Sequence, residues 1–66
     1  MSFTIAFDFP ELDDPLFAAV LKDGVGWTGA LAQAVKFKTE DQAERFLENG
    51  YGPGTKPFGV VVEVSR

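Results

Sequence analysis

Hydrophobic and polar positions alternate strictly at both ends of the chain. In residues 2–9 the odd positions are apolar, and Pro10 follows directly; they are Phe3, Ile5, Phe7 and Phe9. In residues 58–65, Phe58 and the valines at even positions alternate with Gly59, Val61, Glu63 and Ser65. A period of two with aromatic and β-branched residues is typical of half-buried strands. We therefore expect a strand at each end, with the Phe/Val faces turned toward a common core.

The apolar run from Leu16 to Leu21 follows Asp14 and Pro15, which together resemble a helix start. Asp is a common N-cap residue, and Pro is favoured at the first helical position. Leu16, Val20 and their neighbours have helical spacing, so the pattern predicts a helix that ends near Gly24. A buried strand over 16–21 is the alternative, because the periodicity of a short apolar run does not distinguish the two.

Residues 25–39 favour a strand, because their large apolar side chains share odd positions. Gly29 is a natural place for a bend or bulge in it. The alanine-rich centre has helical propensity and favours the opposite interpretation. The helix over residues 40–49 is signalled more clearly, since Thr39 and Gln42 have the spacing of a capping box and Asn49-Gly50 can end it.

The predicted order is strand, helix, strand, helix, strand in a single domain of residues 1–66. This order indicates an α+β fold, with a three-stranded sheet and two helices packed on one face. The other face would be small and flat, carrying Thr4, Ala6, Ala32 and Val61. Self-association through this face or a strand edge, as a small structural or assembly module, is one hypothesis for function. A charge placed at Ala32 or Val61 would disrupt it.

The composition excludes much catalytic chemistry. The chain has 66 residues without histidine or cysteine, so the commonest bases, nucleophiles and transition-metal ligands are absent. Gly24–Gly29 matches G-x-G-x-x-G, but the chain has no room for the further strands of a dinucleotide fold. Glu11, Asp13 and Asp14 do not have the spacing of a calcium loop. We therefore expect no enzyme activity, no cofactor and no metal.

The net charge of −4 argues against nucleic acid as a direct ligand, because phosphate binding needs clustered Lys and Arg. Residues 1–9 lack the pattern of a signal peptide, and no stretch approaches the roughly 20 apolar residues of a membrane span. A protein in the reducing cytoplasm, without a membrane partner, fits this composition.

Acidic side chains gather on and around the predicted helices. Glu40, Glu44 and Glu48 recur every four residues with Asp41 beside them, at an axial spacing of about 6 Å. A second cluster brackets the first predicted helix and comprises Asp8, Glu11, Asp13, Asp14 and Asp23. Solvated helix faces are one explanation. The alternative is a surface that imitates a row of phosphates and binds a basic nucleic-acid-binding protein.

Two aromatic residues lie in or beside glycine-rich turns. Trp and Tyr are common in binding hot spots. We expect Trp27 to pack in the core and Tyr51 to be exposed, where it could join the partner-binding surface.

In size and charge the chain resembles small acidic proteins of phages and mobile elements, in particular the anti-CRISPR inhibitors of type I systems. The likeness is carried by the acidic helix (Glu40, Asp41, Glu44 and Glu48) and by the cluster from Asp8 to Asp23. The resemblance implies a DNA mimic that blocks a positively charged surface of a Cas subunit in a bacterial cytoplasm. The large subunit of a type I-C Cascade complex is its narrowest candidate partner. A monomer is the expected state, with a homodimer as the alternative.

Overall fold

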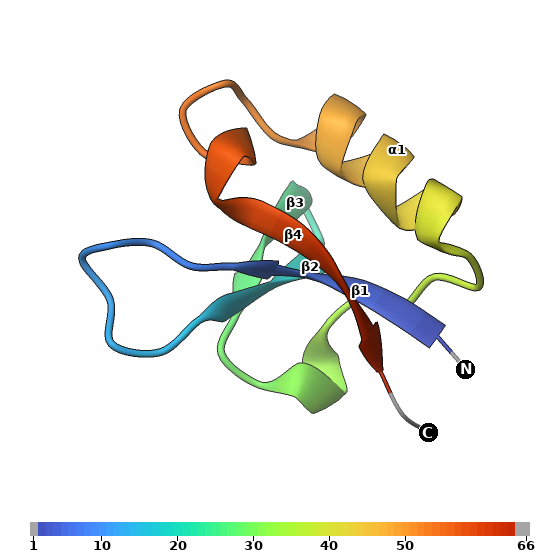
Figure 1. Cartoon of the computed structure of the whole chain (residues 1–66), viewed down its shortest axis with the longest axis horizontal. Helices are drawn as coiled ribbons and strands as arrows, with labels where there is room; N and C mark the ends of the chain where they lie inside the picture. Colours follow the sequence, from blue (N-terminus) through green and yellow to red (C-terminus); the bar gives the residue numbers. More distant parts are fainter. Residues whose placement is uncertain (1, 65–66) are drawn as a thin grey trace.

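A four-stranded sheet is the frame of the molecule. The computed structural model describes residues 2–64. The strands are antiparallel in the order β3-β2-β1-β4, and their bounds are β1 Ser2–Phe7, β2 Leu16–Leu21, β3 Gly24–Thr28 and β4 Gly59–Val64. The helical elements are η1 (Leu31–Gln33, 3-10), α1 (Glu40–Gly50) and η2 (Lys56–Phe58, 3-10). Figure 1 shows α1 across one face of the sheet and η1 on the other side. The α+β class is confirmed, and no helix in residues 2–64 is long and apolar enough to cross a membrane.

The predicted three-stranded sheet with two helices is wrong, because the segment predicted as the first helix is strand β2. β2 pairs with both neighbours, and its central residues Ala18 and Ala19 are both buried, one on each face of the sheet. Burial on both faces removes the alternation by which a strand is normally recognised. The Asp14-Pro15 helix start therefore belongs to the loop before β2. The strand alternative for residues 16–21 is the correct one.

A tight turn joins β2 to β3. Leu21 pairs with Gly24, which leaves only Lys22 and Asp23 in the turn, and Gly24 has a φ of 139°. That dihedral lies in the region that glycine adopts without steric cost. Gly24 thus begins β3 directly after a hairpin turn, whereas the sequence pattern assigned it to a helix end.

The single strand predicted over residues 25–39 is shorter than expected. β3 ends at Thr28, η1 follows, and residues 35–37 lie beside β1 and β2. β1 and β2 pair only at Ala6–Phe17 and Phe7–Leu16, so the strands diverge beyond these positions. Two contacts fill the gap: Val35 N–H donates to the Ala18 carbonyl at 2.9 Å, and Phe3 and Phe37 exchange backbone hydrogen bonds.

The core lies between the sheet and α1. Its buried members are Ile5, Phe7, Ala18, Ala43 and Tyr51. The odd-numbered face of β1 is therefore the core face, as the alternation predicts. β4 passes so close that a Cβ at Gly59 would lie 2.8 Å from Leu47 Cδ1 and 2.9 Å from Phe7 Cε2. Only glycine fits there without displacing its neighbours.

The two faces of β4 are reversed relative to the prediction. Ile5 pairs with Val61, and cross-strand partners share a face, so Val61 packs on the core side. The even-numbered valines face the other way, and Val60 is 56% exposed. An alternating run of valines on both faces carries no signal for which face is buried. Ser65, at the end of the predicted strand, lies outside the described residues.

Candidate protein-binding surface

Helix α1 forms where the sequence predicts it, and its N-terminus is capped. The Thr39 side chain accepts a hydrogen bond from the Gln42 N–H at 3.1 Å. The Gln42 side chain accepts from the Lys38 N–H at 3.1 Å, one residue before the donor that a standard capping box uses. Glu40 and Asp41 lie in the first turn, where the helix dipole favours negative charge. These hydrogen bonds fix the start of the helix at Glu40, and with it the positions of the acidic residues around the helix axis.

The carboxylates of α1 occupy one flank of the helix. At 100° per residue, Glu40, Glu44 and Glu48 follow one another along the helix, and Asp41 lies next to Glu48 around the axis. All four side chains are exposed, whereas Ala43 is buried against the sheet. We call this set the acidic flank. Its axial spacing is about 6 Å, so the row of carboxylates predicted from the sequence exists in the structure.

Two of these four carboxylates pair with cations. Arg45 Nε lies 3.2 Å from Asp41 Oδ2, and Lys56 Nζ lies 3.1 Å from Glu48 Oε1. Glu40 and Glu44 take part in no ion pair among residues 2–64. Exposed ion pairs of this kind contribute only about 0.2–1 kcal/mol to stability. An arginine or lysine of a partner can therefore replace Arg45 or Lys56 beside these carboxylates.

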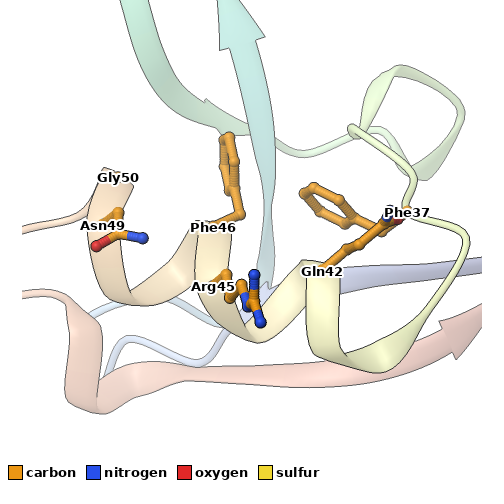
Figure 2. Close-up of a pocket in the computed structure, with 6 residues that line it drawn as sticks. All are labelled: Phe37, Gln42, Arg45, Phe46, Asn49 and Gly50. Atoms are coloured by element: carbon orange, nitrogen blue, oxygen red, sulfur yellow. The ribbon is translucent and has the colours of Figure 1, made fainter.

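The opposite flank of α1 borders an open pocket of about 430 Å³. Its lining residues are Phe37, Gln42, Arg45, Phe46, Asn49 and Gly50. Figure 2 shows the Phe37 and Phe46 rings side by side, with the polar side chains along the helix. The ring centroids lie 5.1 Å apart. This apolar pocket with an amide and guanidinium rim has no counterpart in the sequence-based expectations, because it needs the Phe3–Phe37 bridge to bring Phe37 beside the helix.

The second predicted acidic cluster does not form one site. The loop between β1 and β2 carries Asp8, Glu11, Asp13 and Asp14, and its backbone projects away from α1 in Figure 1. Asp23 lies in the turn at the other end of β2. These residues do not bracket a helix, since the segment between them is a strand. In residues 2–64 no three acidic side chains come together closely enough to hold a metal ion.

Tyr51 is buried, and the expectation that it is exposed is wrong. The residue is 7% exposed, and its ring packs beside Phe7, Phe46 and Trp27. Its hydroxyl donates to the Gly26 carbonyl at 2.6 Å. Burial raises the pKa of Tyr51 above its ordinary value, and a backbone hydrogen bond from Ala19 offsets part of this rise. A tyrosine held in this way belongs to the core and leaves the acidic flank without an aromatic anchor.

Trp27 lies at the border between core and surface. Its ring packs edge-on against Phe7 and Phe9, as expected for a core residue, yet the residue as a whole is 37% exposed. Phe58 contacts Phe9 and is exposed to the same degree. The aromatic residues near the glycine-rich turns thus form one cluster at the end of the sheet.

Comparison with protein-family models, curated proteins and solved structures finds no match to this chain.

Proposed function

We propose that this protein is a non-enzymatic inhibitor in the cytoplasm of a bacterial host, and that it acts as a DNA mimic on a type I Cas subunit. The observation that carries the proposal is the acidic flank of α1. It presents four exposed carboxylates at about 6 Å axial spacing. Arginine and lysine side chains that line a DNA-binding channel would pair with such a row, and opposite potentials would speed the encounter.

We restrict the proposed interface to α1. The loop carboxylates Asp13 and Asp14 lie away from α1, so they contribute long-range attraction and not contacts. Tyr51 is buried and is not part of the surface. The proposal therefore rests on Glu40, Glu44 and Glu48, with Asp41 beside them.

The test is a mobility-shift assay with purified type I-C Cascade and a target duplex. Wild-type protein should reduce DNA binding by the complex, and the double variant Glu44→Lys/Glu48→Lys should lose this effect. The matched control is Asp13→Lys/Asp14→Lys, which changes the net charge equally at the other end of the molecule and should still inhibit. Equal inhibition by all three proteins would remove the acidic flank from the interface, and no inhibition by wild type would refute this partner.

A further inference from the structure

Within residues 2–64, the outer edge of β4 carries backbone groups that no strand pairs. β4 is an edge strand, bound to β1 alone. Phe3 exchanges hydrogen bonds with Phe37 on the far side of β1, and Asp8 N–H donates to the Phe58 carbonyl on the near side. In an antiparallel ladder, the backbone N–H and C=O groups of successive residues point to opposite sides of the strand. Even-numbered residues of β1 therefore bond to β4, through Val60, Val62 and Val64.

The remaining residues of β4 point their backbone outward. Val61 and Glu63 each present an N–H and a C=O to the open edge, whereas the Gly59 N–H is already bonded to the Lys56 carbonyl. Both side chains lie on the α1 face, since they pair with Ile5 and Phe3. An unpaired edge of this kind is a template for another extended chain.

The acidic flank of α1 lies above this edge. Leu47 reaches Gly59, and Lys56, which leads into β4, pairs with Glu48. The other flank faces away, because Phe46 packs on Phe37 at the far side of β1. The start of α1 lies near the Glu63 end of β4, since the chain enters the helix from Phe37, beside Phe3. Glu40, Glu44 and Glu63 are thus negative charges bordering one edge.

The spacings of helix and strand match along this edge. Carboxylates on the acidic flank repeat about every 6 Å along the helix. Side chains on one face of a strand repeat about every 6.7 Å. A strand added to β4 with a basic residue at every second position would present its cations in step with the acidic flank.

We propose that the β4 edge and the acidic flank together bind an extended basic segment of the partner as an additional antiparallel strand. This deepens the proposed function and rests on it in one respect, that the partner is basic. A second copy of this chain fits poorly, because a two-fold axis at β4 would place the two acidic flanks side by side on one face of the joined sheet.

The geometry fixes which residues of the segment bond to β4. Residues opposite Val61 and Glu63 form the hydrogen-bonded pairs, and their side chains lie on the α1 face. The basic residues must therefore be the ones whose N–H groups bond to β4. In strand addition, the residues that carry the positive charges are also the ones whose N–H groups bond to β4. A purely electrostatic encounter has no such requirement, so the two binding modes can be distinguished.

The test uses a synthetic peptide of alternating Val and Lys, titrated against the full chain by NMR. The outward N–H groups of Val61 and Glu63 should exchange fast in the free protein, and binding should slow their exchange. Methylation of the backbone nitrogens of the lysines should weaken binding about tenfold or more, because it removes the N–H groups that bond to β4. Methylation of the backbone nitrogens of the valines should leave binding unchanged. Equal effects of the two methylations, or the reverse order, would overturn the inference.

Two protein variants complete the test. Glu63→Pro removes an outward N–H without breaking a bond to β1, and Glu63→Gln removes the same charge but keeps the N–H. The proline variant should bind the peptide about tenfold more weakly than the glutamine variant. Equal affinities would overturn the inference, as would a concentration-dependent dimer in sedimentation that Glu63→Pro abolishes. If Glu63→Pro still inhibits Cascade, strand addition at the β4 edge is refuted and the proposed function stands. If the protein binds the peptide but does not inhibit Cascade, strand addition stands and the proposed function is refuted.

Discussion

The two faces of the sheet are closed by different means. On the α1 face, aromatic and aliphatic side chains from the strands and the helix fill the space around Phe7, Ile5 and Tyr51. On the opposite face, η1 and the chain after it give only partial cover, and the buried Thr4 side chain donates to the Val35 carbonyl at 2.6 Å. Val60, which pairs with Ala6 on the same face, remains exposed.

This difference shows how a short chain divides its apolar residues. A domain of this size cannot cover both faces of a sheet with large side chains. The chain places its volume on one face and joins the other to a backbone segment by hydrogen bonds. We therefore expect the α1 face to be sensitive to lost volume and the opposite face to be sensitive to lost polar contacts.

The largest expected effect is at the centre of the α1 face. Phe7→Ala should lower the free energy of unfolding by about 3–5 kcal/mol, because Phe7 is fully buried and contacts three aromatic rings. Phe17→Ala makes the same deletion on the half-buried opposite face and should lower it by about 1–2 kcal/mol. Urea titration measures both. Equal losses would contradict the division of roles between the faces.

A smaller effect is expected at Thr4, where the opposite face depends on a hydroxyl. Thr4→Val keeps the volume but leaves the Val35 carbonyl without this donor, so stability should fall by about 1–3 kcal/mol. Thr4→Ser keeps the hydroxyl and loses one methyl group, which should cost about 0.8 kcal/mol. If urea titration shows the serine variant to be the less stable of the two, packing and not the hydrogen bond secures this face.

The same contrast explains which elements could be predicted from the sequence. β1 lies with one side against the core and shows a clean alternation, so both the strand and its buried face are predicted correctly. Helix α1 is equally clear, because its cap and its apolar positions agree. The failures fall where a segment is buried on both faces, as at Ala18 and Ala19, or where valines occupy both faces, as in β4.

The candidate site divides in a similar way. The acidic flank depends only on helical periodicity, so its carboxylates could be identified before the structure. The β4 edge and the pocket at Phe37 depend on strand order and on a bridge between distant residues, which no local pattern encodes. The burial of Tyr51 is not encoded locally either, because its hydroxyl donates to the carbonyl of Gly26 in strand β3, which is distant in sequence.

Tyr51 gives the smallest expected effect and a pH-dependent view of the α1 face. Tyr51→Phe removes the bond to the Gly26 carbonyl and should lower stability by about 1 kcal/mol near pH 8. The folded state raises the Tyr51 pKa, so it holds the phenolic proton more tightly than the unfolded chain does. Wild type should therefore lose stability as the pH rises above the ordinary tyrosine pKa of 10.0. The phenylalanine variant lacks this contribution.

The chain contains one tyrosine, so the ultraviolet absorbance of the phenolate reports on Tyr51 alone. In the folded protein the absorbance should rise at a higher pH than in urea, and urea titrations of the two proteins should converge in stability through the same interval. A phenolate that forms at the same pH in both states would mean that the hydroxyl is solvated. The α1 face would then be sealed less completely by its aromatic side chains than the packing around Phe7 indicates, and its contrast with the Thr4 face would weaken.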